Sequence, residues 1–167
     1  YLYAKTVTLG RTHWAETNRV MLRNRRIGCS VSGVAQFITK NGMGELQNWL
    51  ETGYDTIQKW DNQYSDWFAV PKSIKTTSVK PSGTVSLLVG ATPGMHYPES
   101  RFYIRRMRLS KHSELLEPLK KANYPLEPAF GSEDTTMVVE VPVDVGEGIR
   151  TAGELSVWEQ FSLAAFL

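Results

Sequence analysis

The sequence predicts an α/β fold, and two β-branched runs and one long helical period carry this prediction. Residues 135–141 and residues 75–79 are rich in threonine and valine, a composition that favours strands. Between residues 46 and 67, large apolar side chains recur every three or four residues, as on one face of a helix. These side chains are Leu46, Trp49, Leu50, Ile57, Trp60, Tyr64 and Trp67. Strands that alternate with helices indicate an α/β architecture.

Besides the helical segment at 46–67, the first half of the chain is expected to contain two further helices. A helix is predicted over residues 12–24, and a basic cluster of Arg23, Arg25 and Arg26 follows its last turn. Residues 27–39 are mostly small, which predicts a tightly buried turn that leads into a helix over residues 31–39. The periodic segment at 46–67 reads as a packing helix, with a bend expected at Gly53.

The second half of the chain alternates short strands, loops and helices. Residues 84–89 predict a short apolar helix or strand, and residues 91–98 a loop. Residues 102–109 predict a strand with Tyr103, Arg105 and Met107 on one side. Ser113 is expected to cap a helix over residues 115–122. Ser156 and Glu159 have the spacing of a capping box for a final helix.

Composition and charge exclude several classes of protein. The 167 residues are 41% apolar and 22% charged, with a formal charge of +2, so no global field attracts nucleic acid. The longest uncharged stretch, residues 81–98, contains prolines and glycines that exclude a membrane helix. The single cysteine, Cys29, cannot form an internal disulfide, and no secretory signal opens the sequence. We therefore expect a cytoplasmic protein with neither a membrane nor a nucleic-acid partner.

Both ends of the sequence are expected to be truncation points within a longer protein. The chain begins at Tyr1 and ends at Leu167 inside a patterned apolar segment, without a helix stop signal. We expect residues 1–167 to form one partial domain that is truncated at both ends, with exposed apolar side chains near residues 163–167.

The best candidate for a binding site is the loop that follows the strand predicted at 75–79. It consists of Pro81, Ser82, Gly83, Thr84, Val85 and Ser86. Its glycine permits close backbone approach, its hydroxyls can donate hydrogen bonds, and the first turn of a helix suits a phosphate. It is not a Walker loop, because it has one glycine and no closing Gly-Lys-Ser/Thr triplet. The pattern alone favours a turn that caps a helix, with phosphate binding as the alternative.

Other residues with reactive side chains give weaker signals. Cys29 lies among small residues and is expected to be a buried packing residue. His13, His96 and His112 show no metal-ligand spacing, so no metal site is predicted. The arginines at 23, 25 and 26, and those at 105, 106 and 108, are expected to be solvated or paired with carboxylates.

Six stretches carry more information than their periodicity. They are residues 5–19, 23–33 (Arg-Asn-Arg-Arg-Ile-Gly-Cys-Ser-Val-Ser-Gly), 80–88 (Lys-Pro-Ser-Gly-Thr-Val-Ser-Leu-Leu), 92–96, 103–106 and 159–167. Together they resemble the adenosylcobalamin-dependent (class II) ribonucleotide reductases of the type that reduces ribonucleoside triphosphates. The block at 80–88 is specific, whereas class I large subunits carry a relative of the block at 23–33.

The resemblance implies a fold, a cofactor and a reaction. The fold is a ten-stranded α/β barrel, of which this chain would be an internal part. Adenosylcobalamin generates a thiyl radical that abstracts the 3′ hydrogen of a ribonucleotide, and a cysteine pair then reduces the 2′ carbon. A thioredoxin-like dithiol restores that pair, and the product is a deoxyribonucleotide for DNA synthesis. In this family, the loop that matches residues 81–86 holds the phosphates of the substrate.

The chain also departs from the family pattern. The Asn-Pro-Cys segment of the radical cysteine, the second cysteine of the reducing pair and the C-terminal shuttle cysteines are absent from these residues. Cys29 lies where the family places no catalytic thiol, and the allosteric specificity site would lie upstream. The resemblance thus implies a substrate-binding wall with no catalytic residue and no metal ligand of its own.

Two other interpretations stay open at this point. The chain could be a complete, non-catalytic nucleotide-binding module, which would unfold cooperatively in isolation and bind nucleotide. It could also belong to a class I large subunit, in which a partner protein delivers the radical. The form of the 80–88 block speaks against class I.

Overall fold

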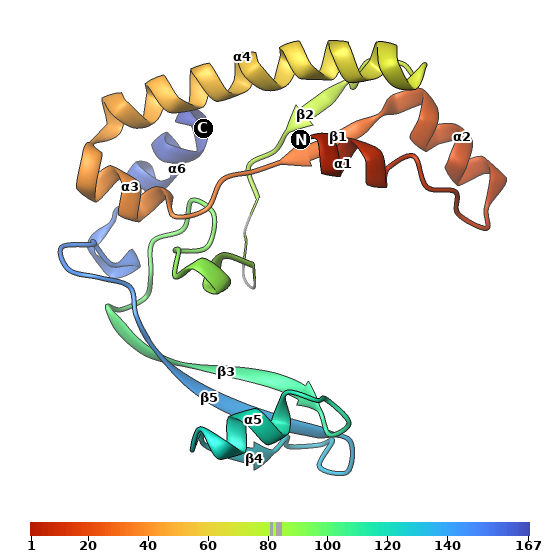
Figure 1. Ribbon diagram of the computed structural model, residues 1–167. Coiled ribbons are helices and arrows are strands. Elements are labelled where there is room, and N and C mark those ends of the chain that lie inside the picture. Colours follow the sequence, from red (N-terminus) through yellow and green to blue (C-terminus); the bar gives the residue numbers. More distant parts are fainter. Residues whose placement is uncertain (81, 83–84) are drawn as a thin grey trace. The chain divides into compact units, whose positions relative to one another are not determined.

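The computed structural model describes residues 1–80, 82 and 85–167 (Figure 1). The chain forms two compact units. The first unit combines Tyr1–Pro98 with Gly148–Leu167, and the second unit is Glu99–Glu147. Each unit has its own sheet, so the two are described separately.

The first unit is mainly helical. Its helices are α1 (Leu2–Val7), α2 (Ala15–Asn24), α3 (Val34–Asn41), α4 (Met43–Phe68) and α6 (Val157–Phe166), with short 3₁₀ helices η1 (Val85–Val89) and η2 (Ala152–Glu154). Its strands are β1 (Arg26–Cys29) and β2 (Lys75–Thr77). The helices predicted at 12–24 and 46–67, the strand at 75–79 and the final helix are confirmed, whereas α1 and β1 were not predicted.

The two strands of the first unit are parallel. Arg26 pairs with Lys75 and Cys29 with Thr77, and the Ser78 N–H donates to the Cys29 carbonyl at 2.8 Å. A crossover through α3 and α4 joins them, as parallel strands require. The stretch 27–39, expected to form a buried turn that leads into a helix over 31–39, begins instead with β1, and the helix is α3, which begins at Val34. Small side chains are still needed there, since a Cβ on Gly28 would lie 3.2 Å from the Ser78 Cβ.

Helix α4 is a single helix of 26 residues that continues through Gly53 (Figure 1). Its apolar stripe is only partly covered: Leu46 is buried, but Trp49 and Trp67 are each 65% exposed. The side chain of Gln58 fastens the helix to β2, because its Nε2 donates to the Thr76 hydroxyl at 2.8 Å. The periodicity therefore predicted the helix correctly and overstated its burial.

The core of the first unit lies where α3, α4 and α6 meet. Val34, Leu46 and Leu163 are its buried residues, and partly buried apolar side chains from the same elements surround them. The capping box of α6 is confirmed: the Glu159 N–H donates a hydrogen bond to the Ser156 hydroxyl at 3.2 Å. Ala164 and Ala165 are exposed, as expected near residues 163–167, and larger exposed apolar side chains lie earlier in the helix. They are Val157, Trp158 and Phe161.

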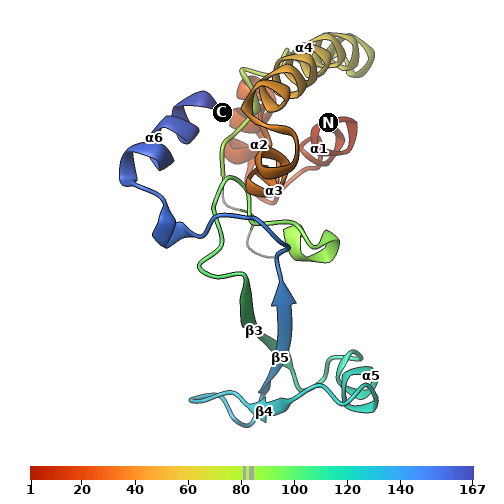
Figure 2. The same cartoon turned by 90° about the vertical axis from the view of Figure 1, so that its left-hand side faces the viewer.

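The second unit is a three-stranded antiparallel sheet with one helix, drawn in Figure 2. The strands β3 (Phe102–Ser110), β5 (Thr136–Asp144) and β4 (Leu126–Pro128) lie in that order, and α5 (Leu116–Lys121) precedes β4. The predicted strands at 102–109 and 135–141 are confirmed as β3 and β5. Burial alternates along β3, with Tyr103, Arg105 and Met107 on the more covered side. The cap expected at Ser113 is wrong, because α5 begins after Leu115.

Candidate functional site

The candidate site lies beyond the carboxyl ends of β1 and β2 (Figure 1). In open α/β sheets, this is where ligands bind, because loops from neighbouring parallel strands converge there. Residues 30–33 follow β1 and lead into α3, and residues 78–86 follow β2 and include the predicted phosphate loop. Two segments about fifty residues apart in sequence thus leave the sheet side by side.

Three of the six predicted loop residues belong to the described part of the chain. Ser82 is half-buried, Val85 is 71% exposed, and Ser86 is buried with its hydroxyl donating to the Ser82 carbonyl. Pro81, Gly83 and Thr84 lie outside the described residues. The segment after the loop is η1, a 3₁₀ helix of five residues. A 3₁₀ helix has poorer hydrogen-bond geometry than an α-helix, so its dipole contributes less than expected to anion binding.

The segment after η1 returns to α3, and residues at the start of that helix hold the segment by hydrogen bonds. The Gln36 side chain donates from Nε2 to the Gly90 carbonyl and accepts at Oε1 from the Thr92 N–H, both at 2.9 Å. The Gly33 N–H donates to the Thr92 carbonyl at 2.8 Å. Gly33 has φ +77, and a Cβ there would lie 3.4 Å from the Ala91 Cβ. The sequence suggested close backbone approach here but not its partner.

A cavity of about 1100 Å³ extends as far as Lys80, the residue directly before the predicted loop. Its walls come from the ends of β1 and β2, one face of α4 and the end of α6. The residues that argue for a ligand site are Lys80, directly before the predicted loop, Tyr54 on α4 and half-buried Cys29 on β1. The volume lies just above the usual range of roughly 300–1,000 Å³ for small-molecule pockets, so the cavity can hold a nucleotide.

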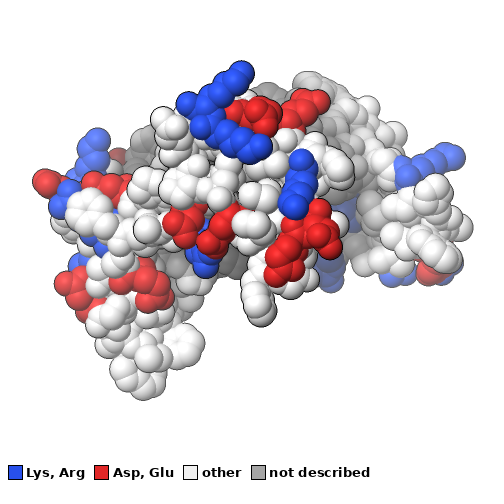
Figure 3. Space-filling model, turned by 90° about the horizontal axis from the view of Figure 1, so that it is seen from below, with Lys and Arg blue, Asp and Glu red and all other residues white. Residues whose placement is uncertain are grey.

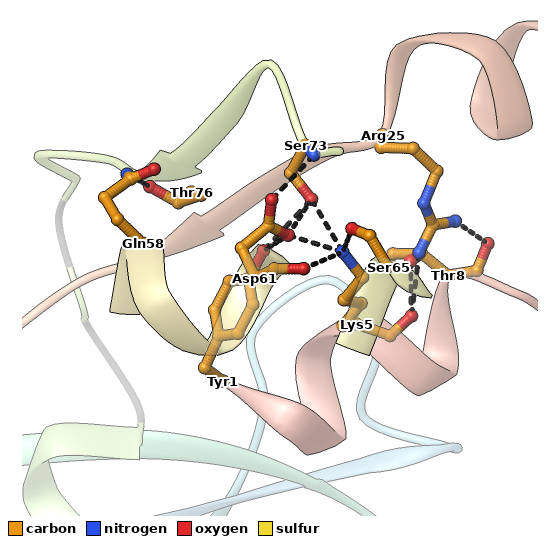
Figure 4. Close-up of polar contacts among 9 residues, drawn as sticks. All are labelled: Tyr1, Lys5, Thr8, Arg25, Gln58, Asp61, Ser65, Ser73 and Thr76. Carbon is orange, nitrogen blue, oxygen red and sulfur yellow. Dashed lines mark hydrogen bonds and ion pairs between the residues drawn. The ribbon is translucent and has the colours of Figure 1, made fainter. Parts of the chain in front are cut away.

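The first unit also contains a buried polar cluster, which connects α1 to α4 (Figure 4). The Lys5 ammonium forms an ion pair with the Asp61 carboxylate and donates to the Ser65 hydroxyl at 2.6 Å. The same carboxylate accepts from the Tyr1 phenol at 2.5 Å and from the Ser73 hydroxyl at 2.6 Å. Lys5 is fully buried and Asp61 is 2% exposed. The cluster therefore connects α1, α4 and the chain just before β2.

Hydrogen bonding sets the pKa of the Asp61 carboxyl. Burial by itself would raise this pKa, but the bonds from Lys5, Ser73 and Tyr1 together lower it to about 2. Burial and the bond to Asp61 raise the pKa of the Tyr1 phenol. The carboxylate is thus ionised and fully bonded at neutral pH, which indicates a structural role rather than acid–base catalysis.

The arginines of the two basic clusters differ from expectation at one position. Arg25 is buried, and its guanidinium donates to the carbonyls of Thr8 and Lys5 at 3.0 and 3.1 Å. The expectation of a solvated or carboxylate-paired side chain is wrong for Arg25, because backbone carbonyls at the end of α1 bind its guanidinium in a buried position. Burial lowers the pKa of this guanidinium. Arg106 pairs with Glu127 and Glu140, as expected.

The surface charges are mixed in sign. On the face drawn in Figure 3, Lys and Arg side chains alternate with Asp and Glu side chains. Several exposed arginines are paired, among them Arg19 with Glu16 and Arg150 with Glu159, both at 2.8 Å. Such exposed pairs contribute little to stability, because solvent screens the charges.

The described residues contain neither a metal-binding cluster nor a membrane-spanning helix. Outside positions 81, 83 and 84, no group of three or more His, Cys, Asp or Glu side chains could hold a metal ion. Within the same residues, no helix is both long enough and apolar enough to cross a membrane. The His96 N–H donates to the Pro93 carbonyl within the loop at 91–98.

The fold matches one class of enzyme. A crystal structure of a B12-dependent (class II) ribonucleotide reductase superposes with a TM-score of 0.79 and 32% sequence identity. The match covers 99% of this chain and 27% of that chain. It confirms the α/β class, while the ten-stranded barrel stays a prediction. No protein-family model matches the chain.

Proteins of similar sequence point to one kind of reductase within this class. The chain is 59% identical over its whole length to a probable adenosylcobalamin-dependent ribonucleoside-triphosphate reductase of Dictyostelium discoideum, and 59% identical to the corresponding reductase of Euglena gracilis. It is 36% identical to that of Levilactobacillus brevis. The chain spans 22%, 23% and 26% of these relatives, respectively. In sequence and fold, the chain is similar to a segment of adenosylcobalamin-dependent, class II ribonucleotide reductases.

Proposed function

We propose that the full-length protein containing this chain reduces ribonucleoside triphosphates to 2′-deoxyribonucleotides. The observation that carries this proposal is 59% identity, over the whole chain, to two proteins named for that reaction. The same similarity favours class II over a class I large subunit and over a separate nucleotide-binding module. In this proposal, residues 1–167 form part of the catalytic barrel.

We further propose that the loop Pro81, Ser82, Gly83, Thr84, Val85 and Ser86 holds the phosphates of the substrate. Its place in the chain, beyond β2 and directly after Lys80 in the wall of a cavity that can hold a nucleotide, supports this role. The Ser86 hydroxyl already donates to the Ser82 carbonyl, which links these two residues of the loop. The hydroxyls of Ser82 and Thr84 are the ones that we expect to donate to phosphate.

The proposed cofactor is adenosylcobalamin, which supplies radicals by homolysis of its cobalt–carbon bond. The described residues do not by themselves fit this cofactor. Their cavity of about 1100 Å³ suits one nucleotide, whereas a corrin ring with its adenosyl ligand and nucleotide tail is much larger. We assign no described residue to the cofactor. The thioredoxin-like reductant and the cytoplasmic location stay predictions.

The loop proposal is tested by the double substitution Ser82→Ala with Thr84→Val in the full-length protein. Loss of two hydrogen bonds to a charged phosphate should weaken substrate binding by about 1–3 kcal/mol, or about 5- to 150-fold. The measurement is the KM for a ribonucleoside triphosphate in steady-state kinetics.

A matched control removes two exposed hydroxyls from helices. Thr52→Val on α4 with Ser162→Ala on α6 should leave the KM unchanged. An unchanged KM in the Ser82/Thr84 double variant would contradict the phosphate-binding role of the loop.

A further inference from the structure

Gln36 makes an unusual pair of contacts with a distant stretch of backbone. Its amide donates to the Gly90 carbonyl and accepts from the Thr92 N–H, so one side chain bonds to the residues on both sides of Ala91. Glutamine and asparagine alone among uncharged side chains carry both a strong amide donor and a carbonyl acceptor. Gln36 therefore offers this segment one hydrogen-bond donor and one acceptor, as the backbone of a neighbouring strand would.

The contacts continue from this segment into the predicted phosphate loop. The Ala91 N–H, between the two residues that Gln36 holds, donates to the Ser86 carbonyl at 2.9 Å. The Ser86 hydroxyl in turn donates to the Ser82 carbonyl. Ser86 and Thr92, which take part in this series, are 2% and 1% exposed. A continuous series of hydrogen bonds thus joins Gln36 to Ser82.

The base of this series is rigid. Gln36 lies in the first turn of α3, directly after Val34 and Ala35, which are 2% and 0% exposed. The Gly33 N–H before the helix bonds to the carbonyl of the same Thr92. A side chain on a buried helical turn can fix the loop more precisely than a side chain on another loop could.

We propose that Gln36 is a positioning residue, which holds the loop at 81–86 in the conformation that binds the phosphates of the substrate. This inference rests on the proposed function of the loop. Gln36 acts through Ser86 and Ser82 and does not touch the substrate. Its contribution is to binding, so its loss should change the affinity for substrate more than the chemical step.

The test is Gln36→Met in the full-length protein, which keeps the length of the side chain and removes both bonds. We expect the KM for a ribonucleoside triphosphate to rise about three- to tenfold, with kcat changed by less than about twofold. In the protein without substrate, the amide hydrogens of Ala91 and Thr92 should exchange about fivefold faster or more. Gln36→Glu keeps the acceptor for Thr92 and should give smaller changes, which preserves the test if Gln36→Met does not fold.

Gln47→Met is the matched control. Gln47 lies exposed on α4, where its amide donates to Glu51 at 2.7 Å. The Gln47→Met variant should change neither the KM for a ribonucleoside triphosphate nor the amide hydrogen exchange of residues 86–92. Equal effects of the two methionine variants would overturn the proposal.

Two further outcomes separate this inference from the function on which it rests. Unchanged exchange at Ala91 and Thr92 in Gln36→Met, together with a raised KM in the Ser82/Thr84 double variant, would overturn the role of Gln36 alone. Faster exchange with an unchanged KM in both variants would overturn phosphate binding by the loop, and the positioning role with it.

Discussion

Asp61 shows how strongly a few residues determine the attachment of α1. Its carboxylate accepts hydrogen bonds from Lys5, Tyr1 and Ser73 in a buried site. Removal of one partner from a buried ion pair leaves an uncompensated charge, which typically costs about 3–5 kcal/mol. The Lys5–Asp61 pair therefore matters far more to this fold than the exposed pairs on the surface.

The lowered pKa of Asp61 predicts an acid-sensitive contribution to stability. The folded-state pKa of about 2 lies below the ordinary value of 3.8, so the unfolded state binds more protons between these pH values. The contribution, about 2 kcal/mol, is complete above pH 4 and is lost as the pH falls toward 2. The measurement is the free energy of unfolding of the full-length wild type and of Asp61→Asn at pH 7, 4 and 3.

The difference between these two proteins should shrink as the pH falls. Asp66→Asn, which changes an exposed carboxylate on the same helix, serves as the control and should differ little from wild type at any of the three pH values. A wild-type advantage over Asp61→Asn that stays constant from pH 7 to pH 3 would contradict the role of the carboxylate.

At the scale of elements, the strength of the local pattern decided what could be predicted: even β2, with three residues, was located by its β-branched run. The sequence located α4, β3 and β5 because each is long enough to show a full period or a β-branched run. It missed α1, with six residues, and β1 and β4, with four and three. Such short elements depend on partners distant in sequence, which local composition does not show.

Helix α4 gives a prediction of its own at Gly53. The sequence suggested a bend, but the helix is continuous and a Cβ at this position would meet no atom within 4 Å. Glycine in a helix interior costs about 0.5–1 kcal/mol relative to alanine. Gly53→Ala should therefore raise the free energy of unfolding of the full-length protein by about that amount, as measured by denaturant titration.

Gly28→Ala is the comparison for this prediction. Its Cβ would lie 3.2 Å from the Ser78 Cβ on the chain beyond β2, so the same chemical change should destabilise the protein. Destabilisation by Gly53→Ala as well would mean that another part of the full-length protein packs against α4 at this glycine.

At the scale of the whole molecule, the candidate site was only partly readable from the sequence. The loop at 81–86 could be located because its serine, glycine and threonine are an uncommon group and its flanks resemble a family. The contact of Gln36 with Gly90 joins residues 54 positions apart, and that of Lys5 with Asp61 residues 56 apart. Neither pair leaves a local pattern, so only the folded chain brings them together. Arg25 was misjudged for the same reason.

The scale of the whole molecule also carries the test of the reaction. The chain spans about a quarter of relatives that are named as adenosylcobalamin-dependent reductases, so turnover must be measured on the full-length protein. We expect it to form a 2′-deoxyribonucleotide from a ribonucleoside triphosphate only when adenosylcobalamin and a dithiol reductant are both present. Radical generation by the cofactor makes a second radical-generating protein unnecessary.

The measurement is chromatographic separation of the deoxyribonucleotide product, with the purified protein alone and with each component omitted in turn. Cobalamin without its adenosyl ligand is the matched control, because it retains the corrin but has no cobalt–carbon bond to the adenosyl group. It should support no turnover. Product formation that needs a partner protein and no cobalamin would instead assign the protein to class I. That result would contradict the class to which the sequence and fold of this segment point.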